Sequence, residues 1–289
     1  LFFQETNVPD DPGRLNIKIE ERFAEAVETM SGGGGSFVIR NTDRTVGARL
    51  SGKIAAIHGN KGMKDTPIHL LFNGTAGQSF GAWNVGGLHM VLTGDANDYV
   101  GKGMAGGKLV IRPPLGVAYK SHEAVIIGNT CLYGATGGWL YAAGRAGERF
   151  AVRNSGAKVV VEGIGDNGCE YMTGGIVTIL GETGVNFGAG MTGGFAYVLD
   201  QAGTLASKVN PELVDIISLD DRAVLQEHLR GMINAHFQET GSERAERILV
   251  GFDEQYVSLF KLVKPKTSDV DTLLGHRGNS PRETLAVVY

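Results

Sequence analysis

The cysteines and histidines of this chain are its first candidates for metal binding or catalysis. The two cysteines, Cys131 and Cys169, are 38 residues apart, which matches neither a zinc nor an iron–sulfur ligand pattern. We predict that both are reduced thiols, buried or in turns. His228 and His236 are eight residues apart on a predicted helix. That is too far for a metal-binding pair at i and i+4, so we expect no metal site there.

Acidic residues and asparagines recur at predicted turns. An acid–base pair of the polysaccharide lyase or hydrolase type needs a shared cleft, so solvated carboxylates are the favoured interpretation. The acidic candidates are Asp95, Asp98, Asp166 and Glu170. The asparagines recur near one phase of a repeat and are interpreted as turn residues that tolerate left-handed conformations. They are Asn97, Asn129, Asn167 and Asn186.

Three glycine segments satisfy the spacing of a dinucleotide fingerprint, at residues 101–106, 163–168 and 188–193. That fingerprint binds a pyrophosphate only when a strand precedes it and a helix follows. Here each segment is followed by another predicted strand, so we interpret these residues as turn glycines. We therefore predict no catalytic, cofactor-binding or metal-binding residue in this chain.

A glycine-led repeat organises the elements that would position any such site. Glycine pairs or single glycines at 137, 156, 174 and 193 are 18 or 19 residues apart, and each precedes an apolar run. Earlier units begin at Gly86 and Gly106. A period of this length indicates stacked copies of one small unit. Because no helical segment fits between the units, we predict a mainly β fold: a single-stranded right-handed parallel β-helix with coils of about 19 residues and a short helical C-terminal tail.

Alternation along each run predicts which side chains point inward. The inward set is apolar apart from its first member: His89, Val91, Leu109, Ile111, Leu140, Ala142, Val159, Val161, Val177, Ile179, Ala196 and Val198. The outward set includes the aromatic residues Trp139, Tyr141, Phe195 and Tyr197. An aromatic stripe on an outer face predicts that something else covers it.

Three regions are predicted. Residues 1–35 are an approach segment with a turn at 10–13, a strand at 15–19, a helix at 20–30 and a glycine linker at 32–35. Residues 36–209 form the repeat, with strands expected at 48–50 and 53–57 and a loop at 113–116. Residues 210–289 form a helical cap and tail, with Ser242 capping one helix and a poorly ordered end after Pro265.

Composition narrows the class of protein. The chain has 289 residues, 44 of them glycine, and a net charge of −4, so nothing favours binding to nucleic acid. No apolar run reaches membrane-spanning length, and two unpaired cysteines fit a cytoplasmic protein. The sequence opens with Leu1 instead of Met, which suggests a processed product or a fragment.

Four blocks resemble a known family. They are residues 41–52 (NTDRTVGARLSG), 73–82 (NGTAGQSFGA), 97–104 (NDYVGKGM) and 260–265 (FKLVKP). In this order they resemble the C-terminal domain of the large subunit of bacterial glutamate synthase, over nearly the whole chain. The resemblance implies a right-handed β-helix without chemistry of its own.

The same resemblance implies a larger enzyme. Its amidotransferase domain releases ammonia from glutamine with a Cys nucleophile. The ammonia then passes through a tunnel to an FMN domain, where 2-oxoglutarate becomes 2-iminoglutarate and is reduced to glutamate. FMN and the iron–sulfur cluster are expected in other parts of the parent enzyme. The expected partners are the amidotransferase and FMN domains of the same large subunit, with a small electron-donating subunit or ferredoxin.

We therefore predict a non-catalytic structural domain whose outer aromatic face and loops pack against the amidotransferase and FMN domains and brace them around the ammonia tunnel. One alternative is a free-standing β-helix subunit of another redox complex, similar to that of formylmethanofuran dehydrogenase. A less favoured alternative is a β-helix enzyme that acts on carbohydrate.

Overall fold

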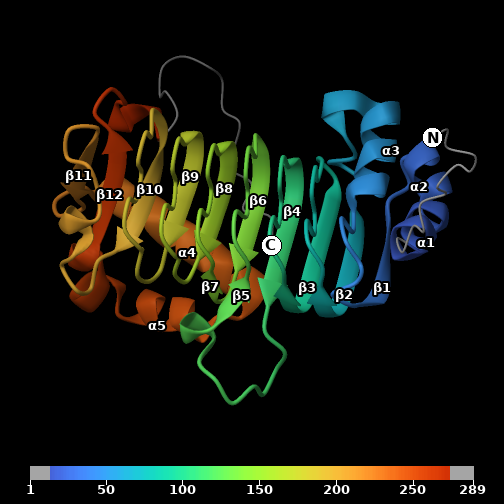
Figure 1. Ribbon diagram of the computed structural model, residues 1–289, viewed down its shortest axis with the longest axis horizontal. Coiled ribbons are helices and arrows are strands. Elements are labelled where there is room, and N and C mark those ends of the chain that lie inside the picture. The colour runs from blue at the N-terminus through green and yellow to red at the C-terminus, as the bar shows by residue number, and fades with distance from the viewer. Residues whose placement is uncertain (1–13, 274–289) are drawn as a thin grey trace, which may run out of the picture.

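A sheet of twelve strands is the main feature of the computed structural model, which describes residues 14–273 (Figure 1). Its strands lie in the order β1-β2-β3-β4-β6-β8-β9-β10-β12-β11, with β5 and β7 off this path. The strands from β1 to β10 pair in parallel, whereas β12 is antiparallel to both β10 and β11. The turn predicted at 10–13 and the chain after residue 273 lie outside the described residues.

The strands along the path are β1 (Gly33–Ile39), β2 (Ile68–Ala76), β3 (Leu88–Ala96), β4 (Ala105–Arg112), β6 (Gly137–Ala142), β8 (Ser155–Val161), β9 (Thr173–Ile179), β10 (Gly193–Leu199), β12 (Phe260–Pro265) and β11 (Val214–Ser218). The short strands off the path are β5 (Val125–Ile127) and β7 (Arg145–Ala146). The α-helices are α1 (Arg14–Arg22), α2 (Ala24–Thr29), α3 (Ala48–His58), α4 (Ala223–Thr240) and α5 (Glu243–Val250).

The prediction of a mainly β, right-handed β-helix is wrong. The glycine-led units do stack in parallel, but almost every unit contributes one strand to one sheet, not the two or three strands that a coil needs. The rest of each unit forms turns, and helices lie beyond β1 and against the sheet near β4–β10 (Figure 1). The architecture is therefore α/β.

Left-handed turns explain why the units stack without helices between most of them. At equivalent positions Gly101, Leu132 and Ala151 have φ of +64°, +61° and +58°. Each donates its backbone N–H to a carbonyl of the preceding unit, as Leu132 does to Val100 at 2.7 Å. A Cβ on Gly101 would lie 2.8 Å from the end of the Leu132 side chain, and the left-handed conformation also favours glycine there. Such turns bring the backbones of successive units into direct hydrogen-bonding contact.

The predicted inward register is correct from β4 onward. Leu109, Leu140 and Val159 are fully buried in one continuous apolar core. In β3 the prediction is wrong by one residue, because Met90 pairs with Leu109 and Leu92 with Ile111. His89 and Val91 therefore face the opposite side of the sheet, and a one-residue shift is enough to exchange the two faces.

A second core forms on the opposite sheet face, where the aromatic stripe was predicted to meet other domains. Tyr141, Phe195 and Tyr197 are indeed on this face, with Trp139 partly buried beside them. The cover, however, comes from this chain: Leu229 and Ile233 of α4 are buried in the same cluster. The aromatic stripe is thus no evidence for an interface with another domain.

The N-terminal elements differ from the predictions. The strands predicted at 15–19 and 48–57 are helices α1 and α3, whose buried Leu50 and Ile54 lie four residues apart on one helix face. Three of the four glycines predicted as a linker, Gly33–Gly35, belong to β1, where a Cβ on Gly35 would lie 3.2 Å from the ring of Phe23. The helix predicted at 20–30 is divided between α1 and α2.

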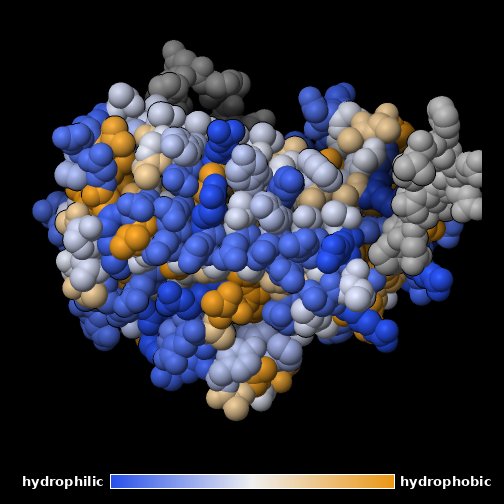
Figure 2. All heavy atoms as spheres, in the orientation of Figure 1, coloured by the Kyte–Doolittle hydropathy of each residue, from blue (hydrophilic) through white to orange (hydrophobic). Residues whose placement is uncertain are grey.

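The C-terminal predictions fare better. Helix α4 forms where predicted, and Ser242 caps α5 by accepting a hydrogen bond from the Ala245 N–H. The loop predicted at 113–116 leaves the sheet between β4 and β5, and Figure 2 shows hydrophobic atoms at the end of the projection it makes. Pro265 ends β12, a strand that was not predicted.

Candidate functional site

Both cysteines lie in the interior core, as predicted. They are free thiols with no exposed surface. Burial raises the pKa of Cys131 to about 12, and burial also raises the pKa of Cys169. The Cys131 thiol donates to the Gly128 carbonyl at 3.3 Å. Because the thiolate is the reactive and metal-binding form, neither thiol is poised for chemistry.

Two of the four acidic candidates hold turns, and the four do not share a cleft. Asp98 Oδ1 accepts from the Asn129 N–H and Asp166 Oδ1 from the Val185 N–H, at 2.7 and 2.8 Å. Asp95 accepts from the Thr75 hydroxyl at 2.8 Å. The carboxylate of Glu170 has no hydrogen bond assigned to it in the described part of the chain. These contacts favour a structural interpretation of the acids.

The asparagines divide into two pairs. Asn167 and Asn186 have φ of +59° and +56°, as predicted, and their side chains are 3.3 Å apart. The side chain of Asn129 accepts from the Glu148 N–H at 2.8 Å, and Asn97 Nδ2 donates to Asn41 Oδ1 at 3.0 Å. Neither Asn97 nor Asn129 has a positive φ, so the left-handed prediction is wrong for them. The glycine segments at 101–106 and 188–193 lead directly into β4 and β10.

The two helical histidines contact different parts of the sheet. His228 Nδ1 lies 3.1 Å from the Tyr197 hydroxyl, and burial lowers its pKa, with the Lys158 charge adding to the effect. His236, also on α4, contacts Glu162. Within residues 14–273, no group of three or more His, Cys, Asp or Glu side chains is placed to hold a metal ion.

A buried polar cluster around Glu162 was missed by the sequence reasoning. Glu162 follows β8, and its Oε1 lies 3.2 Å from His236 Nε2. The same oxygen accepts a short hydrogen bond from Ser242 Oγ, while Oε2 is 3.4 Å from Ser121 Oγ. The side chains of Glu162 and His236 have no exposed surface. The sequence signal was an acidic residue directly after an apolar strand. Its partners are far away in sequence: Ser121 is 41 residues away, His236 is 74 and Ser242 is 80.

This cluster contains Ser, His and Glu in an order that does not activate a nucleophile. In a catalytic triad the serine donates to the histidine and the carboxylate orients that histidine. Here Ser242 and His236 both contact one carboxylate oxygen, and Ser242 Oγ also accepts from the Ala245 N–H. The arrangement joins β8, α4 and α5, which is a structural task.

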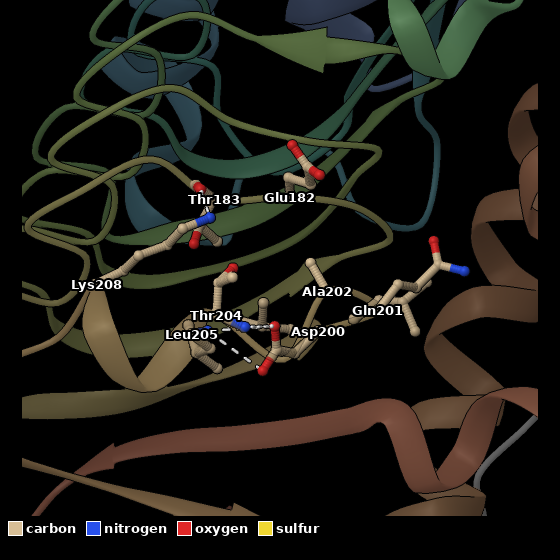
Figure 3. A pocket seen from close by; sticks show the side chains of 10 residues that line it. Glu182, Thr183, Asp200, Gln201, Ala202, Thr204, Leu205 and Lys208 are labelled. Carbon is tan, nitrogen blue, oxygen red and sulfur yellow. Dashed lines mark hydrogen bonds between the residues drawn. The ribbon is translucent and has the colours of Figure 1, made fainter.

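Neither of two pockets in the described chain gathers the candidate residues named above. One pocket, between Glu182, Asp200 and Lys208, has a cavity volume of about 10 Å³, room for one water molecule (Figure 3). Its polar groups bind one another: Lys208 Nζ donates to the Thr183 carbonyl at 2.6 Å, and Asp200 accepts from the Thr204 N–H at 2.9 Å. A wider hollow of about 600 Å³ on the outer side of α5 is lined by Glu243, Glu246, Arg247, Val250, Gly251, Glu254 and Gln255.

Among known protein families, the one described as GXGXG motif matches residues 16–266. The chain belongs to the GXGXG motif family. The left-handed pairs Gly101/Gly103 and Gly188/Gly190 are instances of such glycine spacing in this sequence.

Relatives of this GXGXG chain are glutamate synthases. It is 53% identical over 235 residues to the ferredoxin-dependent glutamate synthase of Pyropia yezoensis, covering 81% of this chain and 15% of that protein. It is 48% identical over 273 residues to the ferredoxin-dependent glutamate synthase 2 of Synechocystis sp., covering 94% and 17%. It is 50% identical over 264 residues to the NADH glutamate synthase of Schizosaccharomyces pombe, covering 90% and 12%. The chain thus spans less than a fifth of the length of these relatives.

The resemblance to glutamate synthase is therefore confirmed at the level of the family. These relatives are named as ferredoxin-dependent and NADH enzymes, so the comparison is not specific to the bacterial large subunit. No helix in residues 14–273 is long and apolar enough to cross a membrane.

Proposed function

We propose that this GXGXG chain is the structural, non-catalytic domain of a glutamate synthase that converts glutamine and 2-oxoglutarate to two molecules of glutamate. The main support is sequence identity of about 50% to such enzymes. The matched region is most of this chain but less than a fifth of each enzyme. In this proposal the domain braces the amidotransferase and FMN domains around an ammonia tunnel. FMN and an iron–sulfur cluster reside in those other parts.

The geometry of the described residues supports a bracing role. Units are joined by backbone hydrogen bonds in both directions, such as Leu132 N–H to Val100 and Thr130 N–H to Glu148. Carboxylates that could do chemistry instead hold turns and helices, as Asp98 and Glu162 do. Rigidity of this kind has catalytic value, because a displacement of about 1 Å between reacting groups can cost about a hundredfold in rate.

The electron donor and the compartment are parts of the proposal. Relatives named as ferredoxin-dependent and as NADH enzymes favour ferredoxin or a reducing subunit as the donor. We propose a cytoplasmic location and the division into regions 1–35, 36–209 and 210–289. Neither the redox-complex subunit nor the carbohydrate enzyme is favoured by a specific observation.

The test uses the full-length polypeptide that contains this chain. Phe80 is fully buried, with its ring 5.4 Å from that of Phe72, so Phe80→Leu loosens the stacked units without adding a polar group. We expect glutamine-dependent glutamate synthesis to fall severalfold while ammonia-dependent synthesis and flavin content are retained. An exposed change, Val224→Ala, is the control. Equal loss of both activities with flavin retained contradicts a role in coupling.

A further inference from the structure

Helix α4 covers only part of one sheet face. Near its start, His228 contacts Tyr197 of β10, and near its end Glu239 binds Lys108 of β4. Gly241 then ends the helix in a left-handed conformation, and the chain continues as α5. The cover therefore stops at β4, three strands before the end of the sheet at β1.

The same apolar row continues beyond the end of α4. Val110 of β4 is fully buried, and its partners in register on the next two strands are Val91 and Leu71. Val91 is half-buried against the α4 core, whereas Leu71 is 47% exposed. Val38 of β1, on the same face, is 72% exposed. The sheet face that α4 covers at β4 is thus continuous with an uncovered face on β1–β3.

We propose that the open face of β1–β3 binds an amphipathic helix from another part of the same parent polypeptide, lying roughly in line with α4. This inference rests on the proposed function and names a partner for it. Relatives carry more than four-fifths of their length outside the part that this chain matches, so such a segment has a source. Three strands at about 4.8 Å spacing span about 14 Å, which a helix of about ten residues crosses at 1.5 Å per residue.

The chemistry of the face specifies the helix. Leu71 and Val38 require aliphatic side chains at i and i+3 or i+4. His69, which is exposed, lies beside them, and its ring centroid is 4.9 Å from that of the partly buried His89. An acidic or hydroxyl side chain of the helix would pair with the His69 ring, as Glu239 of α4 pairs with Lys108 of β4.

A photo-crosslink in the full-length polypeptide tests this. The photoreactive residue p-benzoylphenylalanine is placed at Leu71 and, as a matched control, at Val224, which is 60% exposed on α4. We expect Leu71 to crosslink within one polypeptide, to a helical segment outside this chain mapped by mass spectrometry, with at least fivefold higher yield than Val224. A crosslink between two copies, or a yield equal to that of the control, overturns the proposal.

A second variant separates this inference from the proposed function. Leu71→Arg leaves an exposed position exposed in this chain, so the chain itself retains its fold. In the full-length enzyme we expect faster amide exchange in β1–β3 and in the crosslinked helix, with Val224→Arg unchanged. If Leu71→Arg changes no exchange rate while Phe80→Leu still uncouples the two activities, the docking proposal fails and the proposed function stands.

Discussion

Glu162 and His236 are 74 residues apart in sequence, yet the carboxylate Oε1 lies 3.2 Å from the imidazole Nε2 in the interior of the protein. Glu162 follows a central strand and His236 is on α4, so the contact fixes the helix on the sheet. Ser242 adds α5 to the same oxygen. Polar groups buried this completely cost free energy when a partner is removed, because the remaining group loses water without gaining a hydrogen bond.

Glu162→Ala should lower the free energy of unfolding by about 3 kcal/mol, since it leaves the Ser242 hydroxyl and the His236 imidazole buried without their acceptor. Glu162→Gln retains an acceptor and should lose about half as much. Urea unfolding of the purified chain measures both. The exposed Glu254→Ala is the control, and a loss for Glu162→Ala no larger than for this control contradicts the assigned role.

His89 should make stability depend on pH. Its pKa is lowered from 6.5 to about 4 by burial first, and then by the charges of Lys108 and His69, with Glu239 opposing. Because the folded pKa lies below the unfolded value, the stabilisation is complete above pH 6.5 and is lost as the pH falls toward 4.

His89→Gln removes that titration. Between pH 7 and pH 4.5 the variant should lose about 1 kcal/mol less stability than the wild type, a value reduced because water screens the partly exposed ring. Urea midpoints at several pH values give the difference, in which the titrations of other groups cancel. Parallel curves for the two proteins would show that His89 is protonated equally in both states.

Sequence periodicity predicted the strand register of Leu109, Leu140 and Val159 correctly. Each apolar run packs in the same environment as the run of the preceding unit. It failed at His89, where the unit begins with a different offset between glycine pair and strand. It also failed for α3, since Leu50 and Ile54 fit a short strand pair as well as one helix face. The fold class was wrong because the turn residues of each unit were assigned to further strands.

The Glu162 cluster could not be predicted from local sequence patterns because its members are far apart in the chain. Ser242 was identified as a helix cap, which is a local property, but its bond to Glu162 spans 80 residues. Likewise, the aromatic residues Tyr141 and Tyr197 were assigned to the correct face, but the helix that covers them comes from much later in the chain. The alternation of residues along a strand specifies which sheet face a side chain is on. Which element covers that face depends on the three-dimensional path of the chain.

Comparing two glycines with similar φ distinguishes the cost of a left-handed backbone from the cost of a steric clash at Cβ. Gly62 and Gly134 have φ of +58° and +65°. A Cβ on Gly62 would lie 2.1 Å from the Gly86 carbonyl oxygen, whereas a Cβ on Gly134 would meet nothing within 4 Å. Gly134→Ala should cost about 1 kcal/mol from the left-handed conformation alone. Gly62→Ala should cost at least about 2 kcal/mol more, since backbone must move. Equal costs in urea unfolding would show that the clash relaxes freely.

The buried thiols should resist modification in the folded chain. With a pKa of about 12, Cys131 is about 10⁻⁴ thiolate at pH 8, and burial raises the pKa of Cys169 as well. Ellman's reagent should therefore titrate neither thiol during the time in which guanidinium-unfolded protein releases two equivalents. Val224→Cys, at an exposed position on α4, should add one fast equivalent and so prove that the assay detects an accessible thiol. Fast reaction of one equivalent in the wild type would mean that the core opens locally at Cys131 or Cys169, and a reactive role for that thiol would have to be reconsidered.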